Sequence, residues 1–171
     1  IAQTIYRTGA DSVLMELLLE AARRGKEVMV VVELQARFDE EANINWAERL
    51  EAVGAQVVYG IVGLKTHAKL LLVTRQEGPA LRRYVHLSTG NYNPRTARLY
   101  EDLGYLTCDP QVGADVTHLF NHLTGYSRRH DYQSLLVAPH DMRVPLIDLI
   151  EHEATFGTDG AIAAKLNSLG D

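Results

Sequence analysis

A histidine and a lysine two residues apart, His67 and Lys69, form the clearest chemical pattern in the sequence. They stand at the start of a strand-like run, so both side chains should point to the same face of that strand. Burying either one without a partner is costly, and a phosphate group is a suitable partner. A neutral imidazole is a good nucleophile toward phosphorus, and an adjacent ammonium stabilises the charge on a transferring group. Because H-x-K is a short pattern, a solvent-exposed pair without chemistry is an equal alternative.

The chain after this pair predicts an antiparallel hairpin. Two strand-like runs, Ala68–Val73 and Tyr84–Ser88, are separated only by the short segment Thr74–Arg83, which contains a Gly-Pro break. That connection is too short for a helical crossover between parallel strands, so the two strands should pair antiparallel. Folding the chain about the break brings His67 close to the segment Thr89–Asn91.

The segment beside His67 is rich in groups that bind phosphate. It contains small hydroxyls, a glycine, Asn91 and Arg98, and Lys65 adds a cation just before His67. Backbone amides in a glycine-containing loop and the forked donors of arginine suit phosphate oxygens. The alternative is a polar turn followed by a helix start at Asn93 and Pro94. That alternative explains the Asn-Pro dipeptide but not the clustering opposite His67.

The elements before the hairpin alternate between strands and helices. We expect strands at Ile1–Tyr6, Val28–Leu34 and Ala55–Tyr59, helices from Ser12 to about Gly25 and over Ile44–Val53, and a polar loop at Gln35–Asn43. This order indicates an α/β fold with parallel strands.

Two arginines follow the first two of these strands. Ligands of open α/β sheets bind at the carboxyl ends of the parallel strands, which is where Arg7 and Arg37 stand. We therefore expect both arginines to converge with His67, Lys69 and Asn91 at one edge of the sheet. His67 begins its strand, so this convergence requires that strand to run antiparallel to the others.

The last part of the chain predicts a helix, a domain boundary and the beginning of a second domain. Asp109–Tyr126 predicts a helix and Ser127–Gln133 a boundary, followed by a short strand at Leu135–Ala138 and a helix from about His140. We interpret residues 1–132 as one domain and 133–171 as the truncated opening of a second. The first residue is Ile1 rather than Met, which indicates a piece of a longer protein.

Composition limits the classes of protein to consider. Apolar residues make up 46% and charged residues 23%, which is typical of a soluble domain with a core rather than of a disordered chain. No apolar run reaches the roughly 18 residues of a membrane-spanning helix. The single Cys108 fits a reducing compartment. The net charge of −5 argues against broad nucleic-acid binding but leaves room for a focused phosphate site.

Four stretches of the sequence closely resemble the phosphohistidine-forming polyphosphate kinase family. They are Glu33–Asn43 (ELQARFDEEAN), Gly63–Lys69 (GLKTHAK), Ser88–Asn93 (STGNYN) and Thr96–Tyr100 (TARLY), and the first is the most specific. The resemblance covers the whole chain. It implies a phospholipase-D-like α/β fold, with a mixed sheet flanked by helices, followed by the start of a second similar domain.

The resemblance also implies a reaction and roles for particular residues. The terminal phosphate of ATP passes to a histidine, here His67, and then reversibly to polyphosphate. A nucleotide contact falls on Tyr100, and Mg²⁺ is associated with Arg7 and Arg37. Because a guanidinium has no lone pair to offer a metal, we expect these arginines to hold phosphate oxygens that in turn bind the Mg²⁺.

Two other functions stay open at this point. A phosphodiesterase of the phospholipase-D superfamily would carry an Asp five residues after the lysine, where this chain has Thr74. A polyphosphate-binding module without turnover is the non-enzymatic alternative. For the kinase we further expect ATP or ADP and polyphosphate as partners, no nucleic acid, and a homo-oligomeric full-length enzyme. We also expect a cytoplasmic, at most membrane-peripheral, location, and an inactive isolated 171-residue chain.

Overall fold

The computed structural model describes residues 1–128 and 131–165, which belong to two compact units. The first unit spans Ile1–Gln133 and contains the sheet with its helices. The second begins at Ser134 and contains α4 (Arg143–Ala154) and the short 3-10 helix η2 (Gly157–Asp159). In the described ranges, no helix combines the length and the apolar character needed to cross a membrane.

The first unit is built on one mixed sheet. Its strands are β1 (Ala2–Ile5), β2 (Met29–Val32), β3 (Gln56–Val58), β4 (Lys69–Glu77), β5 (Ala80–Ser88) and β6 (Gly104–Thr107), in the spatial order β3-β2-β1-β4-β5-β6. β1, β2 and β3 are parallel, as their β-α-β-α-β order predicts. β4 pairs antiparallel with β1, and β5 and β6 continue antiparallel. The predicted mixed α/β sheet, the hairpin and the reversed direction of the His67 strand are therefore confirmed.

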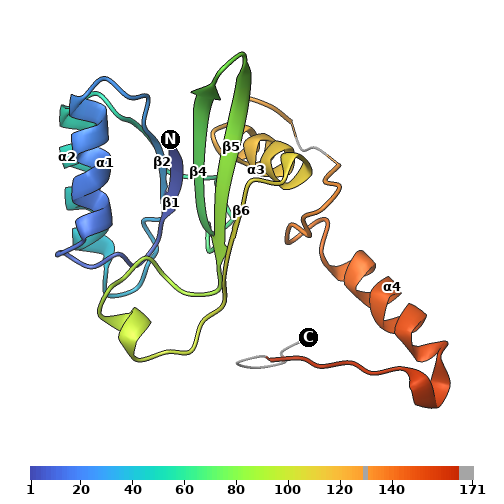
Figure 1. Ribbon diagram of the computed structural model, residues 1–171. Coiled ribbons are helices and arrows are strands. Elements are labelled where there is room, and N and C mark those ends of the chain that lie inside the picture. The colour runs from blue at the N-terminus through green and yellow to red at the C-terminus, as the bar shows by residue number, and fades with distance from the viewer. Residues whose placement is uncertain (129–130, 166–171) are drawn as a thin grey trace. The chain divides into compact units, whose positions relative to one another are not determined.

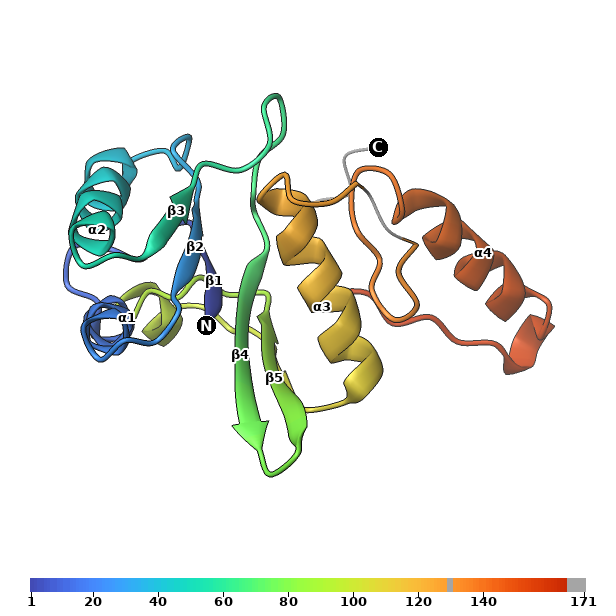
Figure 2. The same cartoon turned by 90° about the horizontal axis from the view of Figure 1, so that it is seen from above.

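Helices cover both faces of this sheet (Figures 1 and 2). α1 (Val13–Arg23) and α2 (Glu40–Ala52) lie on one face, and α3 (Pro110–Leu123) packs against β5 and β4 on the other. Alternate residues of β1 and β2, Ile5, Val30 and Val32, join the core under α1 and α2 and are fully buried. Each such side chain contributes about 1.5–3 kcal/mol through removal of apolar area from water.

The boundaries of α2 and of the β4–β5 hairpin differ from the prediction. α2 begins at Glu40, not at Ile44, so the end of the expected polar loop is helical. Glu40 and Glu41 stand in its first turn, where acidic side chains are stabilised by the free N–H groups of the helix terminus. The hairpin strands run almost to the turn at Gly78, further than the apolar runs indicated, because ladder hydrogen bonds extend into polar sequence.

Two further predictions about elements fail. Leu135–Ala138 is not a strand, since no neighbouring strand pairs with it among the described residues, and α4 begins at Arg143 rather than near His140. β6 was not predicted at all. Its sequence is short and gains its strand conformation by pairing with β5.

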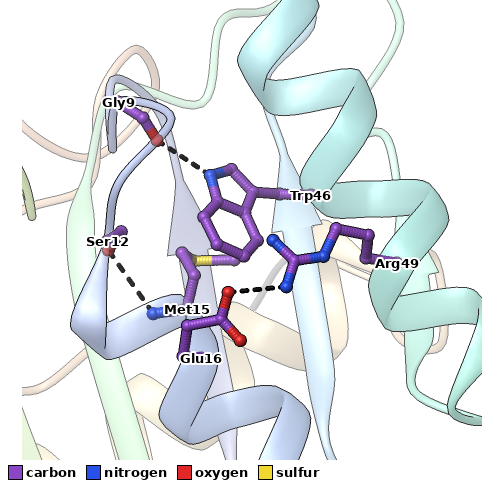
Figure 3. Close-up of polar contacts among 6 residues, drawn as sticks. All are labelled: Gly9, Ser12, Met15, Glu16, Trp46 and Arg49. Carbon is purple, nitrogen blue, oxygen red and sulfur yellow. Dashed lines mark hydrogen bonds and ion pairs between the residues drawn. The ribbon is translucent and has the colours of Figure 1, made fainter.

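Trp46 on α2 holds the loop that follows β1 (Figure 3). Its Nε1 donates a hydrogen bond to the carbonyl oxygen of Gly9 at 2.8 Å, and its ring is almost fully buried. Gly9 has a φ of +74°, a conformation that favours glycine. In the same view Arg49, whose guanidinium lies 4.3 Å above the Trp46 ring, forms an ion pair with Glu16. Trp46 therefore connects the loop after β1 to α2.

Replacing Trp46 tests this anchor. Trp46→Phe removes the hydrogen bond but keeps an aromatic ring, so we expect it to lower the free energy of unfolding by about 1 kcal/mol. Trp46→Ala also leaves a cavity and should cost about 3–5 kcal/mol. Glu16→Gln, which only removes the exposed ion pair, is the control and should stay within about 0.5 kcal/mol of the wild type. Urea denaturation measures all three, and a Trp46→Phe protein as stable as the wild type would contradict the anchor.

Candidate functional site

The ends of several elements meet at one edge of the sheet. β1 and β2 end at this edge because they are parallel, and β4 begins there because it is antiparallel to β1. β5 also ends there, since it pairs antiparallel with β4 along its length. Figure 1 shows the long connection from β5 to β6, which includes the short helix η1 (Thr96–Arg98), at the same end of the sheet. Residues that follow β1, precede β4 and follow β5 therefore come together.

The imidazole of His67 contacts both the Tyr6 ring and the Lys69 ammonium. The ring centroids of Tyr6 and His67 are 4.6 Å apart, edge to face. Lys69 Nζ lies 3.2 Å from Nδ1 and 3.1 Å from Nε2 of His67, and it donates to the His67 carbonyl oxygen at 2.6 Å. Because the two ring distances are nearly equal, the ammonium does not lie along the lone pair of either nitrogen. The ring can therefore present a nitrogen lone pair to another group.

The surroundings of His67 favour its neutral form. The residue is exposed, yet its neighbours remove part of its water, and this desolvation lowers the pKa of His67. The positive charges of Lys69, Arg7 and Lys65 lower that pKa further. A proton on the imidazole would add a positive charge beside these cations, which is why it is disfavoured.

Lys69 is itself perturbed. The residue is only 6% exposed, and burial together with the charge of Arg7 lowers the pKa of Lys69 to about 8, although the carboxylate of Asp102 acts in the opposite direction. Lys69 Nζ also lies 5.0 Å from the centroid of the Tyr6 ring. The site thus combines a neutral imidazole with an ammonium that loses its proton more readily than a surface lysine.

Several buried polar atoms at this edge have no partner among the described residues. They include Nε of Arg7, the hydroxyl oxygen of Thr8 and Oδ1 of Asn91. Thr8 is 1% exposed, and the Arg7 guanidinium lies 5.1 Å from the Tyr6 ring that touches His67. Unpaired buried donors are costly, and an anion with several oxygens would satisfy those of Arg7 and Thr8. Arg7 and Asn91 were predicted at this edge from the sequence, whereas Thr8 was not.

The backbone on either side of His67 is held by buried side chains. Before it, the N–H of Thr66 donates to Oε2 of Glu33 at 2.7 Å. After it, the Thr4 hydroxyl donates to the carbonyl oxygen of Ala68 at 2.7 Å and accepts from the N–H of Leu70 at 3.0 Å. Within the described ranges, Glu33 forms no ion pair with Lys69 or an arginine.

The β5–β6 connection is held by its own polar side chains. Ser88, opposite Lys69 in the β4–β5 pair, accepts a hydrogen bond from the N–H of Gly90, and the Thr89 hydroxyl donates to Asp102 at 3.2 Å. Asn93 Oδ1 accepts from the N–H groups of Arg95 and Thr96, which is the helix-start function that its Asn-Pro sequence suggested. These hydrogen bonds fix the start of η1 within the connection.

The remaining predicted site residues are exposed. Arg37 is exposed in the loop between β2 and α2 and makes no hydrogen bond or ion pair in the part of the chain that the structure describes. Arg98 is exposed on η1, and Tyr100 is 66% exposed two residues later. Lys65 is exposed and acts on His67 through its charge. These four side chains are thus exposed and free to contact a ligand.

The donor groups near His67 do not fit a metal site of their own. Across residues 1–128 and 131–165, no group of three or more His, Cys, Asp or Glu side chains could hold a metal ion. Arg7 and Arg37 are permanent cations without a lone pair. The unpartnered, buried Nε of Arg7 suits a phosphate oxygen instead. These residues fit the anionic partner of Mg²⁺ rather than the ion itself.

Comparisons with known proteins identify the family of this chain. The family model described as polyphosphate kinase C-terminal domain 1 matches residues 1–129. The whole chain is 60% identical to a polyphosphate kinase of Synechocystis sp., of which it covers 24%, and 58% identical to one of Streptomyces coelicolor, of which it covers 23%.

A solved structure is also similar. The crystal structure of polyphosphate kinase from Porphyromonas gingivalis matches 93% of this chain with a TM-score of 0.77 and 38% sequence identity, and the chain covers 27% of it. The chain therefore spans about a quarter of the length of the relatives it matches. The match and the mixed sheet flanked by helices confirm the expected phospholipase-D-like fold. Because the family model matches residues 1–129 and the named relatives match the chain over its whole length, this protein belongs to the polyphosphate kinase family.

Proposed function

We propose that this chain carries the phosphohistidine centre of a polyphosphate kinase, which reversibly transfers the terminal phosphate of ATP to polyphosphate through His67. Membership of the family supports the overall reaction. The observation that carries the assignment to His67 is the placement of its imidazole. The ring is exposed and favoured in the neutral form, and Lys69 lies across it without lying along the lone pair of either nitrogen.

The proposed transfer runs in two balanced steps. In the first, a lone pair of a His67 ring nitrogen attacks the terminal phosphorus of ATP; a P–N bond forms, the bridging P–O bond breaks, and ADP leaves with the electron pair. In the second, a terminal oxygen of polyphosphate attacks the same phosphorus, the P–N bond breaks, and neutral imidazole is restored. Lys69 and Arg7 would stabilise the charge on the phosphoryl oxygens in both steps.

The remaining predicted contacts fit the phosphates and the nucleotide. Arg7 Nε and the Thr8 hydroxyl are the unpartnered buried donors closest in the chain to Tyr6, so we assign them to phosphate oxygens. We keep Asn91, Arg98 and Lys65 as further phosphate contacts and Tyr100 as a nucleotide contact. Their exposure or free polar atoms leave them available for this. In this proposal Mg²⁺ arrives on the phosphates, with Arg7 and Arg37 binding phosphate oxygens beside it.

His67→Ala is the direct test in the full-length protein. We expect no acid-labile phosphate after incubation with labelled ATP, and no ADP release in the presence of polyphosphate, because the attacking nitrogen is gone. His122→Ala, on α3, is the matched control and should form the phosphoenzyme at the wild-type rate.

Three outcomes would count against the proposal. An acid-labile phosphate that persists in His67→Ala would refute the role of His67. Hydrolysis of a phosphate diester by the wild type, without ADP release from ATP, would favour a phosphodiesterase. Polyphosphate binding without any covalent phosphate would favour a binding module.

The pH dependence of phosphoenzyme formation tests the pKa values of the pair. The rate should rise with pH through the lowered pKa of His67, below 6.5, because only neutral imidazole attacks. It should fall again above about 8, where Lys69 loses its proton.

In Lys69→Met, we expect a rate reduced by about 100-fold and no alkaline limb. Its acid limb should move to higher pH, because the charge that lowers the His67 pKa is absent. An alkaline limb that persists in Lys69→Met would contradict this assignment.

A further inference from the structure

The carboxylate of Glu33 is buried without a cation. It stands at the end of β2, is 7% exposed, and forms no ion pair within the described residues. Instead, Oε2 accepts the N–H of Thr66 at 2.7 Å and Oε1 accepts the N–H of Gln35 at 2.8 Å. Removing a carboxylate from water is costly, and two charge-assisted hydrogen bonds to backbone N–H groups offset part of that cost. Each oxygen of this carboxylate therefore holds one specific backbone position.

One of these positions directly precedes the proposed nucleophile. Thr66 is the residue before His67, in the connection between β3 and β4. In this connection the four residues before Thr66, from Val62 to Lys65, are all exposed. The Thr66 side chain is itself buried and approaches Gly60, where an added Cβ would lie 2.9 Å from the Thr66 hydroxyl oxygen. The Glu33 bond thus marks the point where the exposed connection becomes fixed.

The other end of Glu33 is fixed by α2. The Asn43 side chain, which is fully buried, donates from Nδ2 to the Glu33 carbonyl oxygen at 2.9 Å. Glu33 is therefore held through its main chain by α2 and through β2 by the sheet, while its side chain holds the backbone before His67. On the far side of His67, Thr4 performs the matching function at Ala68.

We propose that Glu33 is the positioning residue for His67: its carboxylate fixes the Thr66 backbone so that the imidazole meets the phosphorus in line. This inference rests on the proposed function, since it assigns Glu33 to the step that His67 performs. Glu33 acts through the backbone and does not touch the imidazole, and its charge is not among the causes that shift the His67 pKa in either direction. Its loss should therefore slow the transfer step without moving the pH profile.

Glu33→Gln in the full-length protein is the sharpest variant. Gln has the same shape, but its amide nitrogen is a donor, so in either orientation it meets one of the two N–H groups as donor against donor. We expect phosphoenzyme formation to slow by about 10- to 100-fold, as expected for a small misplacement of a nucleophile. The KM for ATP and the midpoint of the acid limb should stay unchanged.

Asp115→Asn is the matched control. Asp115 is also a buried carboxylate that accepts a backbone N–H, that of Gln133 at 2.9 Å, but it lies on α3. A rate loss of the same size in both variants, or a wild-type rate in Glu33→Gln, would overturn the proposal. If Glu33→Gln fails to fold, Glu33→Asp carries the test. Its shorter side chain keeps the charge but cannot reach both N–H groups, and a wild-type rate there would overturn the proposal equally.

Amide hydrogen exchange separates this inference from the function it rests on. Without nucleotide, the Thr66 amide should exchange slowly in the wild type and at least about tenfold faster in Glu33→Gln. Equal exchange in the two proteins would overturn the positioning role. Labelled phosphate absent from His67 in the wild type would instead count against the proposed function, whatever the exchange result.

Discussion

The antiparallel pairing of β4 with β1 is the constraint on which the candidate site depends. Because β4 runs against β1 and β2, its first residues meet the carboxyl ends of those strands. Had β4 been parallel, His67 would lie at the opposite edge from Arg7 and Glu33. The reversal also brings the imidazole beside Arg7, whose positive charge, with that of Lys69 on the same strand, adds to the desolvation that lowers the His67 pKa. The direction of one strand therefore determines the placement of the proposed nucleophile and contributes to its neutral state.

Local patterns in the sequence predicted most of the fold. The predictions that failed concern segments whose structure depends on pairing with a strand distant in the sequence. The apolar run before Glu33 predicts a buried strand, and the Gly-Pro break predicts the hairpin turn. Both signals lie within a few residues of the structure that they determine, so the parallel strands and the reversal were predictable. β6 was not, because Gly104–Thr107 becomes a strand only through pairing with β5. Leu135–Ala138 fails in the opposite way: its residues favour a strand, but it has no neighbouring strand among the described residues.

In the candidate site, too, local sequence patterns predicted some residues, whereas others are defined only by tertiary contacts. Strand alternation placed His67 and Lys69 side by side, and the position after β1 placed Arg7 at their edge. Thr8 was missed because a threonine in a loop carries no signal until burial deprives its hydroxyl of partners. The partners of Glu33 could not be predicted, since a sequence shows charges but not the backbone N–H groups that a folded loop presents. Those N–H groups are the partners that the carboxylate has.

The identity of the phosphorylated atom is the decisive test of the proposed role of His67. Full-length protein is incubated briefly with ATP, quenched in alkali to preserve phosphoramidates, and digested, and the phosphate is located by fragment-ion mass spectrometry. We expect one acid-labile phosphate, on a ring nitrogen of His67, and its loss on addition of ADP or polyphosphate. A phosphate on any other residue, or transfer of phosphate to polyphosphate with no phosphoenzyme formed, would contradict it.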